Sequence, residues 1–206
     1  LRYILCKAWG QLHNLLITKG GMMKMMSLLQ RFDDSILLFV KYNMHGIIMD
    51  KIMVISTYLG NNGIIWIIIA LVLICNHKYR KVGFMALAAL ILSGILGDEI
   101  LKNVFRRARP LDTISTMNIL IPRPLSYSFP SGHTMSSFAV AGVLGKCFKK
   151  YAIEFISLAS LIAFSRVYLY VHYPTDVLAG AILGLMCSAI VIYLFNKLDH
   201  KSKASI

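Results

Sequence analysis

Charged side chains are scarce in this chain of 206 residues. Lysine, arginine, aspartate and glutamate make up 15% of it, hydrophobic residues make up 57%, and the mean hydropathy is +0.67. This composition is typical of an integral membrane protein and excludes a soluble globular core. We therefore expect the lipid bilayer to surround most of the chain.

Cysteine is also sparse, and its pattern excludes two further classes of protein. The four cysteines are scattered without any paired spacing, at Cys6, Cys75, Cys147 and Cys187. Disulfide frameworks and structural zinc sites both use closely spaced pairs. No internal repeat or low-complexity linker divides the chain either, so we expect one helical domain without structural metal.

Long apolar runs take the place of the missing charges. Four nearly uncharged runs occupy residues 82–101, 134–145, 155–165 and 177–195. Several of them approach the roughly 20 residues that a helix needs to cross the hydrocarbon. Residues 62–76 are apolar but short, and they span only if flanking residues help. Residues 32–59 mix apolar and charged residues, which favours an amphipathic helix in the membrane interface.

These runs predict the fold class and the limits of the domain. We expect an all-α, polytopic transmembrane bundle of five spans, or six if residues 32–59 cross, with an interfacial N-terminal helix. The domain is expected at residues 32–196, followed by a basic cytoplasmic tail at 197–206. Residues 1–31 are expected to be an extension that is native only in part, because methionines crowd at residues 22–26, where a start codon is plausible.

The net charge of +13 is distributed between the spans and not gathered in one tract. Basic groups lie at residues 77–81, 146–150 and 197–203. Cytoplasmic loops are enriched in lysine and arginine, so we place all three groups in the cytoplasm and expect no nucleic-acid partner. The connections at residues 105–131 and 171–175 then face the outer side of the plasma membrane.

The first outer connection breaks this charge rule. One acidic residue, Asp112, stands against four arginines, namely Arg106, Arg107, Arg109 and Arg123. Lys102 lies just before them, and Asp98, four residues earlier, can pair with it inside the membrane. Lys102 alone is also explained as a cation that reaches from a helix end to the interface. The density of guanidinium groups favours an anionic ligand, because arginine grips phosphate with two donors.

A short polar motif, FPSGHT at residues 129–134, opens the next apolar run. Ser131 is a good N-cap residue, Gly132 lets the backbone approach a ligand closely, and the helix is expected from Thr134 onward. The free amides of a helix N-terminus bind anions, and His133 stands beside them as a candidate proton donor. An ordinary N-cap without a ligand is the alternative interpretation.

A second histidine precedes the last apolar run. Pro174 fits the first turn of the last helix, which leaves His172 just outside and Asp176 able to reach back to the imidazole. A carboxylate against one ring nitrogen leaves the other nitrogen free to act as a nucleophile or base. A purely structural histidine–aspartate bond at a helix start is the alternative.

Taken together, these segments resemble the three-part signature of the type 2 phosphatidic acid phosphatase (PAP2) superfamily. Its parts read Lys102, six residues, Arg109, Pro110; then Pro130, Ser131, Gly132, His133; then Ser165, Arg166, five residues, His172, three residues, Asp176. The resemblance covers about residues 35–196, with the order and spacing of the motifs intact. Short bacterial members of this family are lipid phosphatases of the membrane.

The resemblance implies a role for each matched residue. His172 would be the nucleophile that forms a phosphohistidine, Asp176 would orient it, and His133 would be the acid for the leaving group. The phosphoryl oxygens would be held by Lys102, Arg109, Arg166 and the backbone amides of Ser131 and Gly132. The outer connections offer no carboxylate cluster, so we expect fixed cations to replace metal ions, and no cofactor.

The expected substrate is a phosphorylated membrane lipid, and undecaprenyl pyrophosphate is preferred. Arg106, Arg107 and Arg123 are additional to the family set and could hold a second phosphate, although non-specific contact with anionic headgroups explains them equally. The alternatives are a phosphatidylglycerophosphate or phosphatidic acid phosphatase, and a non-catalytic binder or transporter of anionic lipids. The sequence leaves the oligomeric state open.

Overall fold

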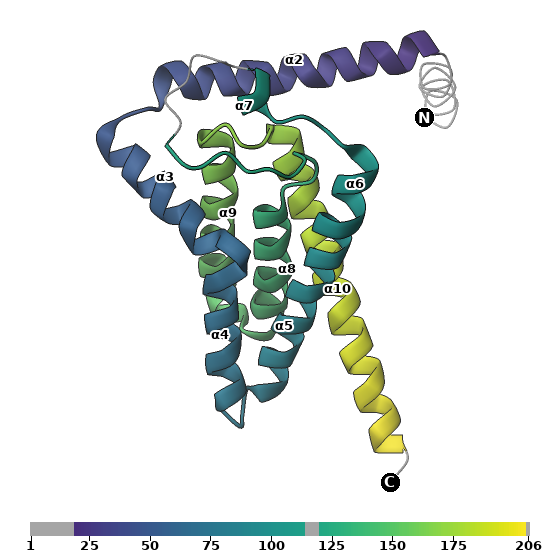
Figure 1. Ribbon diagram of the computed structural model, residues 1–206. Helices are drawn as coiled ribbons and strands as arrows, with labels where there is room; N and C mark the ends of the chain where they lie inside the picture. Colours follow the sequence, from purple (N-terminus) through teal and green to yellow (C-terminus); the bar gives the residue numbers. More distant parts are fainter. Residues whose placement is uncertain (1–18, 114–119, 205–206) are drawn as a thin grey trace, which may run out of the picture.

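The computed structural model describes residues 19–113 and 120–204, and every regular element in these ranges is a helix. An upright bundle lies beneath one long helix, α2 (Lys19–Asn43), which crosses one end of it (Figure 1). The bundle consists of α3 (Ile47–Gly60), α4 (Ile64–Cys75), α5 (Arg80–Gly94), α8 (Gly132–Cys147), α9 (Ala152–Tyr168) and α10 (Pro174–Ala204). The short helices α6 (Lys102–Phe105) and α7 (Pro110–Thr113) lie at the end that α2 crosses.

Within the described residues, four segments are long and apolar enough to cross a membrane, which supports the expected polytopic fold. They are Ile47–Cys75, Arg80–Asp112, Lys149–Tyr168 and Pro174–Asp199. Helix α8 has only 16 residues, but it is the most enclosed helix and packs against α5, α9 and α10. The all-helical fold is therefore confirmed for the described residues, whereas the five or six crossings stay a prediction.

The N-terminal part differs from the single interfacial helix expected at residues 32–59. The chain forms two helices, α2 and α3, because Gly46 is extended (φ −177°, ψ 156°) and interrupts the helical backbone. Helix α3 then continues into α4 through a kink at Asn62 and Gly63, where φ is 51° and 68°. Residues 62–76 are too short to cross the bilayer alone, and α3 supplies the additional residues. The expected extension at residues 1–31 lies partly outside the described residues.

Helix α2 is amphipathic, and its buried face rests on the bundle. Leu37 and Val40 are buried in a cluster with Tyr168 and Val171 near the end of α9. Met26, Phe32 and other apolar side chains of α2 are exposed. Their exposure on a helix lying across the bundle end suits the boundary between lipid and water.

Close packing of α8 and α10 brings two of the sequence motifs together. A β-carbon on Gly180 would lie 2.8 Å from the carbonyl oxygen of Ser131, and one on Gly184 would lie 2.4 Å from that of Met135. The two helix backbones can therefore touch only because these positions carry no side chain. Their contact places the start of α10, with Asp176, beside the start of α8.

The predicted basic groups lie together at the other end of the bundle. The rings of Tyr79 and Phe148 contact each other at 5.2 Å, and Lys81 pairs with Asp199 near the end of α10. The α4–α5 and α8–α9 connections are consequently neighbours, far from α2, α6 and α7 (Figure 1). This arrangement is the one that the distribution of lysine and arginine predicts.

Candidate active site

The three sequence motifs meet at one cavity of about 600 Å³. Its walls come from the α3–α4 kink, α5, α8, the end of α9 and the loops that carry the motifs. The lining side chains that bear chemistry are Asp98, Glu99, Lys102, Arg109, His133, Arg166 and His172. Residues separated by up to 74 positions in the chain therefore face a single space, which one small anion can occupy.

His172 lies in the loop between α9 and α10, and its side chain is 2% exposed. Its Nε2 atom is 3.1 Å from Nη1 of Arg109. Because arginine can only donate, Nε2 must be the unprotonated, accepting nitrogen, and the proton of the neutral ring sits on Nδ1. Nδ1 faces Asp176 Oδ2 at 3.8 Å and Ser128 Oγ at 3.5 Å. Nε2 is thus unprotonated and is covered by the Arg109 donor.

The surroundings of His172 keep its imidazole neutral. Burial, assisted by the positive charges of Arg109 and Arg166 and opposed by Asp176, lowers the pKa of His172 from 6.5 to about 3. A ring with this pKa stays unprotonated at Nε2 throughout the physiological pH range. His172 can therefore act as a nucleophile without first losing a proton.

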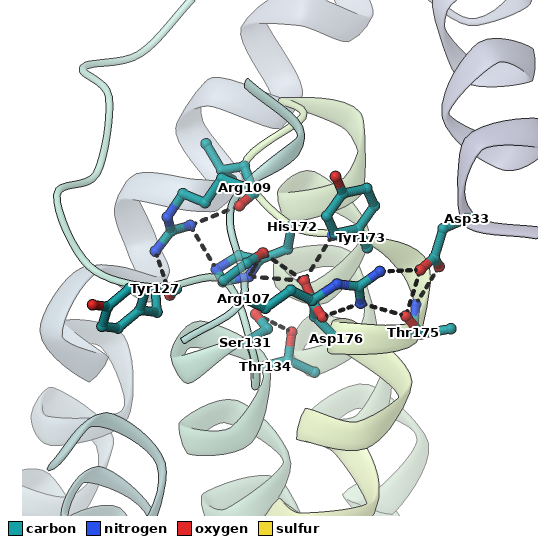
Figure 2. A network of polar contacts seen from close by, with 12 residues as sticks. Asp33, Arg107, Arg109, Tyr127, Ser131, Thr134, His172, Tyr173, Thr175 and Asp176 are labelled. Atoms are coloured by element: carbon teal, nitrogen blue, oxygen red, sulfur yellow. Dashed lines mark hydrogen bonds and ion pairs between the residues drawn. The ribbon is translucent and has the colours of Figure 1, made fainter. Parts of the chain in front are cut away.

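Asp176 is fully buried, and its carboxylate is held from several directions (Figure 2). Oδ2 accepts hydrogen bonds from Ser128 Oγ at 2.5 Å and from the backbone amide of Tyr173 at 3.0 Å. Oδ1 pairs with Nη1 of Arg107 at 2.6 Å. These bonds fix the carboxylate in the position from which it faces the Nδ1–H group of His172.

Arg109 is clamped between two loops by its own hydrogen bonds. Nε donates to the carbonyl oxygen of Ser126 at 2.7 Å, and Nη1 donates to that of Val171 at 2.6 Å. Nη2 donates to the carbonyl oxygen of Tyr127 at 3.1 Å. The guanidinium group is therefore held beside His172, where a phosphate bound next to the ring would meet it.

Arg166, on α9, has a donor that is left without a partner. Its side chain is 3% exposed, and Nη1 donates to Thr57 on α3. Nε of Arg166 is the only buried side-chain nitrogen or oxygen without a hydrogen bond in the part of the chain that the structure describes. An unmet buried donor costs about 1–3 kcal/mol, so Arg166, beside the cavity, is a candidate for binding an anionic ligand.

Lys102 pairs with Asp98 at 2.6 Å, which confirms the ion pair predicted from their spacing. Lys102 also donates to Ser126 Oγ at 3.2 Å. Asp98 belongs to a π-helical stretch, Ile95–Leu101, and such stretches often occur at functional sites. A β-carbon on Gly132 would lie 2.7 Å from Asp98 Oδ1, so the glycine permits this close approach at the start of α8.

The start of α8 is tied to other helices more fully than the motif alone suggests. Ser131 stands at the N-cap position, but its hydroxyl accepts a bond from Thr134 Oγ1 at 2.9 Å and its amide donates to the carbonyl oxygen of Asp176 at 3.2 Å. The Ser131 amide is thus occupied, whereas Gly132 lines the cavity. Nε2 of His133 is 2.7 Å from Asn61 Oδ1, at the α3–α4 kink.

The three additional arginines do not belong to the described lining of the cavity. Arg106 is exposed and donates to the carbonyl oxygen of Asn103 at 3.0 Å. Arg123 lies 3.6 Å from Asp112 and donates to the backbone of α7. Arg107 instead lies behind Asp176, on the side of the carboxylate that faces α2 (Figure 2).

Several polar contacts of the site were not anticipated from the sequence. Asn61, Ser126 and Ser128 are isolated polar residues without a distinctive spacing. Asp33 did carry a signal, because it lies four and seven residues before Leu37 and Val40 and therefore shares the apolar face of α2. A carboxylate on an otherwise apolar helix face is a candidate for a buried ion pair.

Comparison with known proteins agrees with this geometry. The sequence profile of the PAP2 superfamily matches residues 79–199. An undecaprenyl-diphosphatase of Sulfolobus acidocaldarius is 29% identical over 180 residues, which cover 84% of this chain and 85% of that protein.

Solved structures lead to the same family. The crystal structure of Aquifex aeolicus LpxE has a TM-score of 0.68 at 28% identity, over 77% of this chain and 93% of the other. A transmembrane PAP2-type phosphatidylglycerolphosphate phosphatase of Bacillus subtilis has a TM-score of 0.65 at 26% identity, over 88% and 89%. The family profile covers more than half of the chain, and the chain therefore belongs to the PAP2 superfamily, as an integral-membrane lipid phosphatase.

Proposed function

We propose that the protein removes a phosphoryl group from a membrane lipid through a phosphohistidine on His172. The observation that carries the proposal is that the unprotonated Nε2 of His172 and the unmet Nε donor of Arg166 belong to side chains that line the same cavity. A tetrahedral phosphate between them satisfies the donor and presents its phosphorus to the nucleophile. Such in-line geometry, together with charge neutralisation, is what phosphoryl transfer requires.

The first step transfers the phosphoryl group to the enzyme. Nε2 of His172 attacks phosphorus, and the bond from phosphorus to the lipid-side oxygen breaks. His133, which the negative charge of the bound phosphate keeps protonated, donates its proton to that oxygen. The Nη1–H group of Arg109 that covers Nε2 moves to a phosphoryl oxygen as the lone pair is used. Lys102 and Arg166 hold the remaining oxygens, while Asp176 stabilises the ring through Nδ1–H.

The second step returns the enzyme to its starting state. His133, now neutral, accepts a proton from water as the water oxygen attacks phosphorus. The bond between phosphorus and Nε2 breaks, inorganic phosphate leaves, and His172 regains its lone pair. Each histidine ends the cycle in the protonation state in which it began.

Undecaprenyl pyrophosphate is the substrate that we favour. The similarity to the undecaprenyl-diphosphatase of Sulfolobus acidocaldarius supports it, and so do three cationic side chains on one cavity, since a diphosphate carries more charge than a monoester. Phosphatidylglycerophosphate is the second candidate, supported by the likeness to the Bacillus subtilis enzyme. Arg106 and Arg123 stay candidates for headgroup contacts outside the cavity.

We place the active site on the outer face of the plasma membrane. The four apolar segments together with α8 give five crossings, while α2 lies in the interface. The basic connections then share the cytoplasmic side, and the cavity opens on the opposite side. An outer site suits the recycling of a carrier lipid, whose monophosphate is regenerated where the carried sugar is delivered.

Phosphate release from a panel of lipids tests this assignment. Undecaprenyl pyrophosphate, phosphatidylglycerophosphate and phosphatidic acid are compared in micelles of equal lipid mole fraction, with His172→Gln as the blank. We expect the diphosphate to give the largest kcat/KM. A higher value for either glycerophospholipid would replace the favoured substrate, and no release from any of the three would overturn the phosphatase proposal.

Chelation tests the role given to the fixed cations. Lys102, Arg109 and Arg166 supply the charge that two metal ions supply in many other phosphatases. We expect turnover in excess EDTA to stay within about twofold of the untreated rate. Loss of turnover that added magnesium or manganese restores would contradict this expectation.

A further inference from the structure

Behind the catalytic histidine, one arginine lies between two buried carboxylates (Figure 2). Arg107 Nη1 is 2.6 Å from Asp176 Oδ1, and Nη2 is 2.7 Å from Asp33 Oδ2. The side chains of Asp33 and Asp176 are both 0% exposed. Asp33 comes from α2 and Asp176 from α10, so Arg107 joins the helix that crosses the bundle end to the carboxylate that faces His172.

Both ends of this chain of ion pairs are fixed by further contacts. Asp33 accepts hydrogen bonds from the amide and the hydroxyl of Thr175, at 2.9 and 2.6 Å. The guanidinium carbon of Arg107 lies 3.9 Å from the centre of the Tyr173 ring. Thr175 and Tyr173 flank the start of α10, within three residues of His172. The ion pairs are therefore built into the loop that carries the nucleophile.

The charges of the group explain why a second carboxylate is useful. A pair of Arg107 and Asp176 alone is neutral, and the guanidinium draws the carboxylate charge away from the imidazole. Asp33 offsets the charge of Arg107, so the three side chains together carry one negative charge. That charge faces a ring which becomes positive when Nε2 bonds to phosphorus.

We propose that Asp33 and Arg107 are positioning residues for the phosphohistidine reaction. Arg107 favours the ionised form of the buried Asp176 and holds its Oδ2 facing Nδ1 of His172. Asp33 offsets the positive charge of Arg107, so that the negative charge of Asp176 still acts on the imidazole. Neither residue touches the substrate. This inference rests on the proposed function, and it assigns to α2 a part in the chemistry of a cavity that α2 does not line.

The principal test replaces Asp33 by asparagine, which keeps the shape and removes the charge. We expect Asp33→Asn to lower kcat by about 10- to 100-fold, the usual effect of losing an outer partner of a functional imidazole, with KM within about twofold. Asp34→Asn is the matched control, because Asp34 is the exposed neighbour on α2 and asparagine keeps an oxygen for Gln30. The control should retain the wild-type rate.

A substrate with an activated leaving group distinguishes defects in the attack by His172 from defects in proton donation by His133. With p-nitrophenyl phosphate as substrate, departure needs little help from His133, so His133→Gln should recover much of its lost rate. Asp33→Asn acts on the attack by His172 and should recover none. Recovery of Asp33→Asn with this substrate would overturn the proposed action through His172.

A double-mutant cycle decides whether Asp33 works through Arg107. We expect Arg107→Gln to lower kcat, and Asp33→Asn to have an effect below about twofold in that background. If Asp33 merely anchors α2 through Thr175, its replacement will lower kcat by the same factor in both backgrounds, which would overturn the inference. Thermal unfolding in detergent shows whether each variant is folded. If Asp33→Asn is not folded, Arg107→Lys is measured in its place, and we expect the same fall in kcat.

The outcomes separate this inference from the proposed function. A wild-type protein that releases phosphate from no lipid and not from p-nitrophenyl phosphate overturns both. A wild-type protein that turns over normally, with Asp33→Asn equal to it in kcat, overturns only the positioning role.

Discussion

His172 and His133 face the same cavity but stand in different settings. One nitrogen of His172 is covered by Arg109, and the other faces a buried carboxylate. His133 instead contacts the neutral side chain of Asn61. A carboxylate partner suits a ring that must become positive during attack, whereas His133 has a neutral side-chain partner and needs the charge of a bound phosphate to hold its proton. The two roles are therefore distinguishable by substitution.

Substitution of the two histidines should give different partial reactions. We expect His172→Gln to lose about 10⁴-fold or more in turnover and to form no acid-labile phosphoenzyme, because the nucleophile is gone. His133→Gln should still form phosphoenzyme from p-nitrophenyl phosphate, since that leaving group departs without a proton. Rapid acid quenching with radiolabelled substrate measures both. Equal phosphoenzyme levels in the two variants would refute the assignment of roles.

The low pKa of His172 makes a prediction about stability. Its pKa is about 3 in the folded protein against 6.5 for the free side chain, chiefly because of burial. Between these values the unfolded chain binds a proton that the folded chain does not, so folding stability falls as the pH decreases below 6.5. Above 6.5 both states are neutral and this contribution is constant.

Thermal unfolding in detergent at pH 7.5 and pH 5 measures this effect. The unfolding temperature of the wild-type protein should fall further between these conditions than that of His172→Gln, whose side chain does not titrate. Phosphoenzyme formation should persist at pH 5, because the nucleophile is still neutral there. An equal fall in unfolding temperature for both proteins would show that His172 titrates normally in the folded state.

Site residues within the three motifs were predicted from the sequence, whereas those brought in by tertiary packing were not. His133, His172 and Asp176 stand at helix ends, where local sequence marks them, and all three motifs converge as expected. Asp33 and Asn61 reach the site only because α2 and the α3–α4 kink pack against it. Such contacts depend on tertiary structure, which spacing along the chain does not encode. For Arg107 the sequence left a second phosphate and an anionic headgroup equally open as partners, and the structure places it between two carboxylates.

At the scale of helices, the contact of α8 and α10 decides where the motifs meet. Gly184→Ala should destabilise the protein by about 1–3 kcal/mol, because its β-carbon would lie 2.4 Å from a carbonyl oxygen of α8 and the backbones must separate. Gly94→Ala is the control: beyond its chain neighbours and its own helix backbone, no atom lies within 4 Å of the added β-carbon, and alanine favours helix by up to about 1 kcal/mol. Unfolding temperatures in one detergent compare the two. A Gly184→Ala protein as stable as Gly94→Ala would contradict the close packing.

Hydrophobic pattern predicted the helices of the bundle better than those of the N-terminal part. The nearly uncharged runs at residues 82–101 and 177–195 fall within α5 with its π-helical extension and within α10. Residues 32–59 are mostly apolar, with charged residues on both sides of Gly46, so composition alone does not reveal the extended backbone at this glycine. That residue separates a helix that crosses the bundle end from one that enters the bundle.

At the scale of the whole molecule, the two ends of the bundle should lie on opposite sides of the membrane. Leu125 is fully exposed near the active site, and Cys75 is exposed at the other end. We compare Leu125→Cys in a chain without native cysteines with a chain that keeps only Cys75. An impermeant maleimide should label the first in right-side-out vesicles and the second in inside-out vesicles. The reverse pattern would place the active site in the cytoplasm.

The cavity lies at the end of the bundle that α2 crosses, where α2 exposes apolar side chains such as Phe32. A site at the depth of the headgroups meets its substrate by lateral diffusion, in two dimensions. Its velocity should then follow the surface density of phosphorylated lipid, and adding inert amphiphile should slow it even when the bulk molarity is unchanged.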